Sequence, residues 1–168
     1  MTPESLVGES SAITSPRQRE ILQLTIDGLT NREIAAKLGV SVKTIEAHSH
    51  NLVMRLTDSS NGFEKSRRKL VTEYIIREVS NGNIFIGEIP DRVVLTKRQG
   101  MVAACLMHGE TNDEISKALY VTRAKVEFDL LNIYRGLGIE ARPRHYFHLR
   151  AVAILAACIA NKRIAVSK

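Results

Sequence analysis

The sequence predicts an all-α protein made of two tandem four-helix helix-turn-helix domains joined by a short linker. Three observations support this prediction. The chain of 168 residues is 44% hydrophobic but has only 5% aromatic residues and no Trp, a composition that favours helices over strands. A long segment recurs 81 residues later in the chain. Each copy also repeats the same residues that start and end helices.

The repeat is clearest when residues 14–56 are compared with residues 95–137. Twelve of the 43 positions are identical. In the first copy the identical residues are Arg17, Gln18, Gly28, Thr30, Asn31, Glu33, Ile34, Leu38, Val40, Glu46, Asn51 and Leu56.

The first helix of each copy begins with a capping box. "SPRQ" at Ser15–Gln18 allows the Ser side chain and the Gln side chain to bind each other's backbone N–H, with Pro in the first helical position. "TKRQ" at Thr96–Gln99 repeats this pattern. Gly28 and Gly109 then supply the left-handed residue that ends each helix.

The second and third helices follow the same logic. "TNRE" from Thr30 and "TNDE" from Thr111 are further capping boxes, which open short helices of about eight residues. "LGVS" at Leu38–Ser41 is a tight turn that caps a third helix. Its apolar positions, Ile45, Leu52 and Leu56, form one buried stripe. This order is that of a helix-turn-helix.

A fourth helix is expected after each copy, over about residues 64–79 and 144–160. The Gly-, Asn- and Pro-containing segment 80–94 is predicted to be a linker that holds one short extended stretch. The predicted units are therefore a loose tail at 1–13, domain 1 at 14–79, the linker at 80–94, and domain 2 at 95–168 with an apolar last helix.

Composition narrows the class of protein. The net charge of +6 favours acidic partners such as nucleic acid. Cys105 and Cys158 are expected to be small core residues in a reducing compartment. Residues 1–13 lack the features of a secretory signal, and the apolar run Ala151–Ala160 is too short to span a bilayer, so we expect a cytoplasmic protein with no membrane contact. No motif predicts an enzyme, a cofactor or a metal site.

Several separated blocks of the first copy resemble the LuxR-type (GerE-type) helix-turn-helix domains of bacterial transcription regulators. The blocks "SPRQREIL", "GLTNREIAAKLGVS", "KTIEAH" and "NLVMRL" keep the family's spacing, whereas the second copy retains only "LTKRQ", "TNDEI" and "GLGI". The resemblance implies four-helix units that bind double-stranded DNA. It also implies that the third helix enters the major groove and that the fourth helix supports dimerisation.

The predicted DNA contacts of the first copy lie around the start of its third helix. Helical spacing places Val42, Lys43, Glu46, Ala47 and His50 opposite the buried stripe, and the resemblance adds Thr44 and His48. Thr30 and Asn31 begin a helix that is suited to phosphate binding, although Thr30 is explained equally well by capping alone. Glu46 departs from the family, which usually has Lys there; a carboxylate repels phosphate but accepts a hydrogen bond from cytosine N4.

The basic run "EKSRRK" near the start of the fourth helix supplies further candidates. Phosphate contact is one interpretation of Lys65, Arg67, Arg68 and Lys69, and an ordinary solvated face is the other.

The second copy departs further from the family. Arg123 and Lys125 are candidate DNA contacts, but Glu127 and Asp129, the latter in place of the family's His, flank Phe128. Phe128 and Leu131 suit a protein contact if they are exposed. The alternative is a rotated helix that buries them.

These residues predict a DNA-binding transcriptional regulator whose first copy is the reader. The rival is a protein-interaction module that binds another regulator or RNA polymerase and has little DNA affinity of its own. Glu46, Glu127 and Asp129 favour the rival, whereas Lys43, Thr44, His48 and the net charge favour DNA binding.

The last helix carries the prediction about assembly. "AVAILAACIA" has no charge or amide, and its small residues allow another helix to approach closely. Ala153, Ala157 and Ala160 are the candidate contacts. The partner is either the first copy in the same chain or the same helix of a second chain, and the family's habit favours a homodimer.

Overall fold

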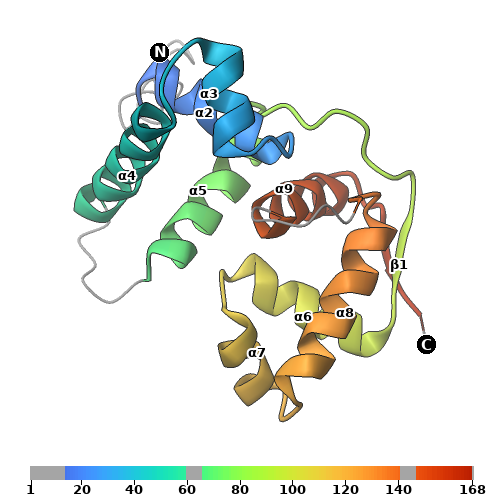
Figure 1. The fold of residues 1–168 in the computed structure, drawn as a ribbon. Coiled ribbons are helices and arrows are strands. Elements are labelled where there is room, and N and C mark those ends of the chain that lie inside the picture. Colours follow the sequence, from blue (N-terminus) through green and yellow to red (C-terminus); the bar gives the residue numbers. More distant parts are fainter. Residues whose placement is uncertain (1–13, 60–65, 141–146, 168) are drawn as a thin grey trace, which may run out of the picture.

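The computed structural model describes residues 14–59, 66–140 and 147–167, and it confirms the predicted all-α fold (Figure 1). Two sets of four helices follow each other in the same order. The first set is α2 (Pro16–Ile26), α3 (Asn31–Leu38), α4 (Val42–Ser59) and α5 (Arg67–Ser80). The second set is α6 (Lys97–Met107), α7 (Asn112–Ala118), α8 (Arg123–Gly136) and α9 (Phe147–Ala160).

The helix starts are those that the sequence predicts. All four capping boxes form, with the side chain of the first residue accepting from the backbone N–H three residues later and the reciprocal bond also present. Gly28 and Gly109 follow the first helix of each set with φ of 94° and 74°, the left-handed region in which only glycine is unstrained. These boundaries are therefore set by local sequence.

The fourth helix of the first set begins three residues later than predicted. Ser66 caps α5 by accepting from the backbone N–H of Lys69, so the helix starts at Arg67 instead of near residue 64. α9 is described from Phe147, and its predicted start near residue 144 lies outside the described residues. The predicted tail, residues 1–13, lies outside the described residues.

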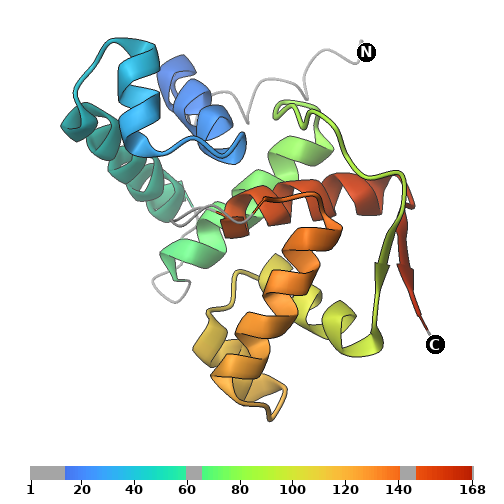
Figure 2. The same cartoon turned by 45° about the vertical axis from the view of Figure 1, so that its right-hand side comes forward.

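Two short strands, which the sequence did not predict as a pair, join the beginning and the end of the second set. β1 (Val93–Leu95) and β2 (Ile164–Val166) are parallel, with Val93 opposite Ile164 (Figure 2). Of the two strands, only β1 overlaps the linker 80–94, in which a short extended stretch was predicted. Val93 and Leu95 are buried, so the strand also contributes to the core.

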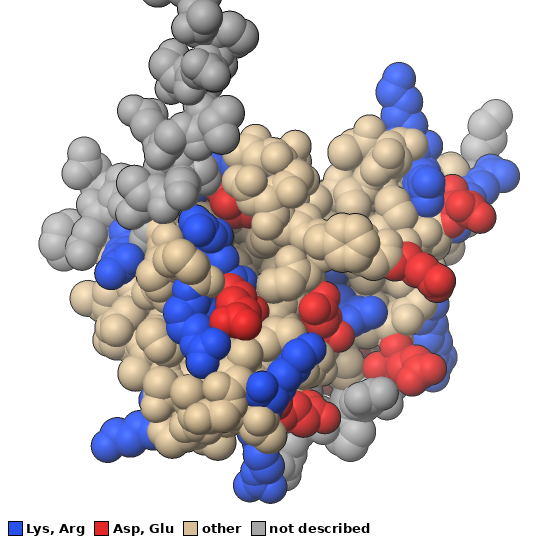
Figure 3. Space-filling view, turned by 90° about the horizontal axis from the view of Figure 1, so that it is seen from above, with Lys and Arg blue, Asp and Glu red and all other residues tan. Residues whose placement is uncertain are grey.

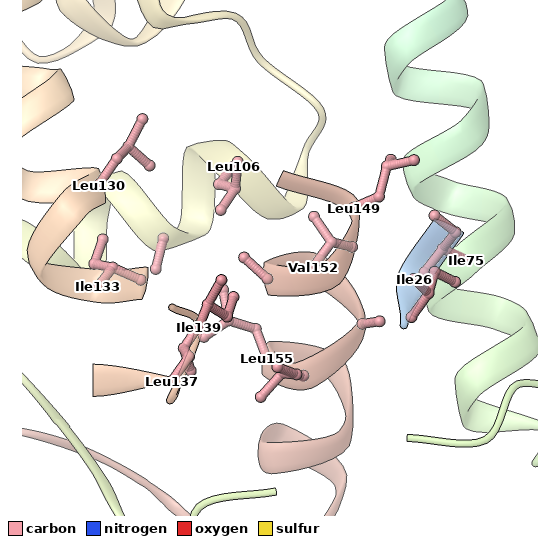
Figure 4. Packing of buried hydrophobic residues seen from close by; sticks show 14 of the residues in the cluster. Ile26, Ile75, Leu106, Leu130, Ile133, Leu137, Ile139, Leu149, Val152 and Leu155 are labelled. Carbon is pink, nitrogen blue, oxygen red and sulfur yellow. The ribbon is translucent and has the colours of Figure 1, made fainter. Parts of the chain in front are cut away.

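Helix α9 lies at the centre of the molecule, between the two sets. It packs against α5 and α2 of the first set and against α6 of the second, and the α5–α9 contact is the most extensive between any two described elements. All eight residues from Ala151 to Cys158 are buried. Figure 4 shows Leu149, Val152 and Leu155 of α9 between Ile26 and Ile75 on one side and Leu106 and Ile133 on the other.

The burial of α9 means that both sets share one hydrophobic core. The same cluster contains Leu22, Leu52 and Ile75 of the first set and Val102 and Val126 of the second. A smaller separate cluster, formed by Ile21, Leu24, Ile34, Ala35 and Ile45, holds α2, α3 and α4 together. The first helix-turn-helix thus has its own small core, and residues of α2, α4 and α5 connect it to the shared core.

This packing corrects the predicted use of the last helix. Ala153 and Ala157 are buried within the chain, so they are not a surface for a second chain, whereas Ala160 at the end of α9 is exposed. As predicted, another helix packs closely against the small residues of α9. Of the two partners considered, the one that the structure contains is the first copy of the same chain.

Polar contacts align the two sets. The guanidinium of Arg150 on α9 donates to the carbonyls of Ile26 and Asp27 at the end of α2, which has no basic residue in its own last turn. On the other side, Gly109 lies against the start of α5. A Cβ at that position would be 2.7 Å from the Cα of Lys69, so the close approach requires glycine.

Enlarging a buried alanine of α9 should destabilise the folded chain. We expect Ala153→Leu to lower the free energy of unfolding by about 1–3 kcal/mol, because the added methyl groups overpack the contacts of α9. Urea denaturation measures this change. Ala160→Leu, on the exposed end of the same helix, is the matched control and should change stability by less than about 0.5 kcal/mol. Equal effects of the two substitutions would contradict the burial of α9.

Candidate nucleic-acid interface

The helix-turn-helix of the first set is formed by α3, the turn at Gly39 and α4. Gly39 has φ of 65° and ends α3. The Ser41 hydroxyl accepts from the backbone N–H of Thr44 at 3.1 Å and lies 2.8 Å from the Thr44 hydroxyl. Ile34 and Ile45 are completely buried where the two helices cross. The turn therefore fixes the start of α4 relative to α3.

The outer face of α4 is open to solvent, where the helical spacing placed it. Val42, Lys43, Glu46, Ala47 and His50 are all exposed. Within the described residues, the Lys43 ammonium forms no ion pair with an acidic side chain. This face presents one uncommitted cation, one carboxylate, the imidazole of His50 and two small or apolar side chains to a partner.

The other predicted residues of the first copy are more enclosed. The Thr30 hydroxyl donates to the Glu33 carboxylate at 2.8 Å within its capping box, which is the alternative role expected for it. Thr44 is half-buried and engaged with Ser41. Asn31 at the start of α3 and His48 on α4 are also half-buried, and both line a cavity behind α4.

The basic run at the start of α5 does not form one surface. Arg67 is exposed. Arg68 is directed toward the second set, and burial lowers the pKa of its guanidinium against the opposing charges of Tyr134 and Glu114. The Lys69 ammonium lies 3.8 Å from the Glu114 carboxylate of α7. Lys65 lies outside the described residues.

The cations of the second copy are paired with acids. The Arg123 Nε donates to Glu127 at 2.9 Å and its Nη1 lies 3.2 Å from the Asp113 carboxylate. The hydrogen bond that Arg123 donates to Glu127 and the charge of Asp113 raise the pKa of Arg123. The Lys125 ammonium is 3.6 Å from Asp129 and 4.5 Å from the centre of the Phe128 ring. Neither cation is uncommitted in the way that Lys43 is.

The sequence suggested that Asp129 flanks Phe128 on the outer surface. The structure corrects this expectation. Asp129 is only 2% exposed and accepts from Arg98 Nε of α6 at 2.8 Å. Because a buried carboxylate needs charged or hydrogen-bonding partners, Asp129 holds α8 against α6. Its negative charge is directed inward, so Glu127 is the remaining acid beside Phe128.

Two aromatic side chains mark the outer face of the second copy. Phe128 is 55% exposed, whereas Leu131 is half-buried. Tyr120, in the turn before α8, is 96% exposed and has φ of 53°, a conformation that is strained for a residue other than glycine. It occupies the position that Gly39 has in the first copy. The exposed Tyr was missed by sequence reasoning, although the loss of that glycine was a readable signal.

The charges of the surface are mixed. On the face shown in Figure 3, basic and acidic side chains are interspersed over a largely uncharged area. The net charge of +6 is therefore not gathered into one basic patch on that face. Within the described ranges, no three His, Cys, Asp or Glu side chains are placed to hold a metal ion, and every helix is too short or too polar to cross a bilayer.

Comparison with known proteins agrees with this geometry. The family described as "Bacterial regulatory proteins, luxR family" matches residues 12–61 and 93–148, which together make up more than half of the chain. The chain belongs to the luxR family of bacterial regulatory proteins. Both matched segments include a helix-turn-helix, namely α3–α4 and α7–α8.

Curated relatives are regulators that match part of the chain. "Probable transcriptional regulator ycf29" of Pyropia yezoensis is 37% identical over 78 residues, 46% of this chain and 30% of that protein. "Oxygen regulatory protein NreC" of Staphylococcus carnosus is 44% identical over 66 residues, 39% of this chain and 27% of that protein. The chain thus spans less than a third of these relatives. No solved structure matches it significantly.

The inward role of Asp129 gives a stability prediction. Asp129→Asn should lower the free energy of unfolding by about 1–3 kcal/mol, because the substitution removes a buried carboxylate that pairs with Arg98 and Lys125. Glu127→Gln, on the exposed side of the same helix, is the control and should cost less than about 0.5 kcal/mol. Chemical denaturation of both variants measures the difference. A loss for Glu127→Gln as large as that for Asp129→Asn would contradict the assignment.

His148 at the start of α9 gives a pH prediction. Burial, reinforced by the charge of Arg68, lowers its pKa from 6.5 to about 4. Between pH 6.5 and about pH 4, the unfolded chain therefore binds a proton at this residue and the folded chain does not. The contribution of neutral His148 to the free energy of unfolding is fully present above pH 6.5 and is lost as the pH falls toward 4. Because the ring is only partly buried, we expect this residue to account for about 1–2 kcal/mol of lost stability at pH 5.

Urea denaturation at pH 7 and pH 5 measures this loss. His148→Gln, which cannot take up a proton, should show a smaller decrease between the two pH values than the wild type does. Identical decreases in both proteins would show that the His148 ring is not protected from protonation.

Proposed function

We propose that the chain is a DNA-binding transcriptional regulator in which α4 of the first copy reads the major groove of double-stranded DNA. The observation that carries this proposal is the contrast between the two third helices. Lys43 is exposed at the start of α4 with no acidic partner in the described residues, whereas Arg123 and Lys125 of α8 are both paired with acids. An unpaired cation contacts phosphate without first breaking an ion pair.

Membership of the luxR family and the regulators among the relatives support the same proposal. The exposed start of α4 is the part of a helix-turn-helix that faces base edges. Glu46 on this face disfavours phosphate but is able to accept from cytosine N4. We therefore assign Lys43 to backbone contact and Glu46 to base contact.

The tandem arrangement has a place in this proposal. Family members pair through their fourth helices, and here the two fourth helices, α5 and α9, pack together within one chain. We propose that a single cytoplasmic chain thereby makes within itself the fourth-helix contact that other members make between two chains. Recognition then requires one chain per site and not a homodimer through α9.

A protein contact is the second candidate function, and it concerns the second copy. Phe128 on α8 and Tyr120 in the turn before α8 are exposed, and Tyr120 has a strained backbone conformation. Exposed aromatic side chains next to neutralised charges suit a protein surface better than a phosphate backbone. Another regulator or RNA polymerase is the proposed partner class, and this contact is compatible with DNA reading by α4.

The contrast between α4 and α8 predicts how DNA binding responds to substitution. Lys43→Ala should weaken binding and flatten the dependence of log affinity on log salt by about one unit, because one phosphate contact is lost. Arg123→Ala, the matched change in α8, should alter both quantities much less. Fluorescence anisotropy with a labelled duplex at several salt concentrations measures them.

Stability must be unchanged for this comparison to hold, and both residues are exposed, so the melting temperatures of the two variants should match that of the wild type. A larger loss of affinity for Arg123→Ala than for Lys43→Ala would transfer DNA reading to α8. Binding that is insensitive to salt in all three proteins would favour the protein-contact function alone.

A further inference from the structure

A cavity lies behind α4, on the side of the helix away from its exposed face. Its volume is about 390 Å³, and it is lined by residues of α2, the start of α3, α4, the start of α5 and the start of α9. This volume falls within the range of small-molecule sites in proteins. Its aliphatic lining consists of Ile21, Leu22, Leu52, Val53, Val71 and Leu149.

Three of the polar side chains that line this cavity are already hydrogen-bonded within the protein. The Gln18 side-chain oxygen accepts from the backbone N–H of Ser15 at 2.9 Å. The hydroxyl of Thr25 donates to the carbonyl of Ile21 at 2.9 Å, and that of Ser49 donates to the carbonyl of Ile45 at 3.0 Å. These walls therefore favour an apolar group.

Among the described residues that line the cavity, the charged side chains are both positive. Arg67 and Arg68 line it at the start of α5, and no Asp or Glu is among the described lining residues. The Nε of Arg68 is buried and has no hydrogen-bond partner, which is costly for a guanidinium. His48 and His148 complete this side, and the low pKa of His148 keeps its ring neutral at pH 7.

We propose that this cavity binds a small organic anion, a carboxylate with an aliphatic body. The carboxylate lies at Arg67 and Arg68, because a guanidinium binds a carboxylate through parallel hydrogen bonds and both residues line the cavity. The aliphatic body lies against Leu52 and Val71. Apolar walls with a few convergent polar groups are the usual design of such sites.

The position of the cavity connects this ligand to the rest of the chain. One wall is the inner side of α4, and the opposite wall includes the start of α9. A bound anion therefore contacts both the helix proposed to read DNA and the helix that joins the two copies. The binding itself does not depend on the proposed DNA function and is measured without DNA.

Titration calorimetry of the whole chain with octanoate tests the proposal. We expect a dissociation constant of about 1 mM or tighter, a typical value for a ligand of this size. Octanol and octylammonium have the same chain without the negative charge and should bind about tenfold more weakly or not at all. Absence of octanoate binding up to about 10 mM would overturn the proposal.

Variants locate the binding. Arg67→Gln should weaken octanoate binding about fivefold, whereas Arg135→Gln, an exposed change on α8, should have no effect. Val71→Phe should fill the cavity and abolish binding, and Val53→Phe on the α4 wall does the same if the first variant fails to fold. Octanoate binding that is unchanged by the filling substitution, or equal binding of octanol, would contradict the proposal.

Discussion

The fold depends on the burial of α9 from both sides. A helix that covers one domain shows polar residues on its outer side, but Ala151 to Cys158 are buried without interruption because a second set of helices lies on that outer side. The alanines bring α5 close, while Leu149, Val152 and Leu155 fill the space between the sets (Figure 4). Arg150, on the same helix, then caps α2. One helix thus unites two repeats into one hydrophobic core.

This shared core allows the two helix-turn-helix units to differ. α3 and α4 have their own small cluster and leave Lys43 exposed and unpaired within the described residues. α8 is fixed instead by Asp129, which pairs with Arg98 and Lys125, and its outer face carries Phe128. The division of function proposed for the copies follows from these local differences, because the same α5–α9 contact positions both units.

The features that could be predicted from the sequence are those that contacts between nearby residues determine. Each capping box joins residues three apart, so the starts of α2, α3, α6 and α7 were readable from single short motifs. Pairings between distant residues were not. Arg98 meets Asp129 from 31 positions away, and Val93 meets Ile164 across the whole second copy, without a pattern in either segment. Likewise, the apolar run of α9 indicated close helix contact but not which helix supplies it. An apolar helix surface does not specify which other apolar surface covers it. The choice between α5 of the same chain and a second chain therefore required three-dimensional information.

The most direct test of the account is whether the methyl groups of α5 and α9 touch within one chain. An isotope-filtered nuclear Overhauser experiment on a mixture of labelled and unlabelled protein separates contacts within a chain from contacts between chains. We predict strong contacts between the methyl groups of α5 and α9 in the uniformly labelled protein and none in the filtered spectrum of the mixture. Contacts between those helices that appear in the filtered spectrum would show that α9 pairs with a second chain, and would contradict the shared core.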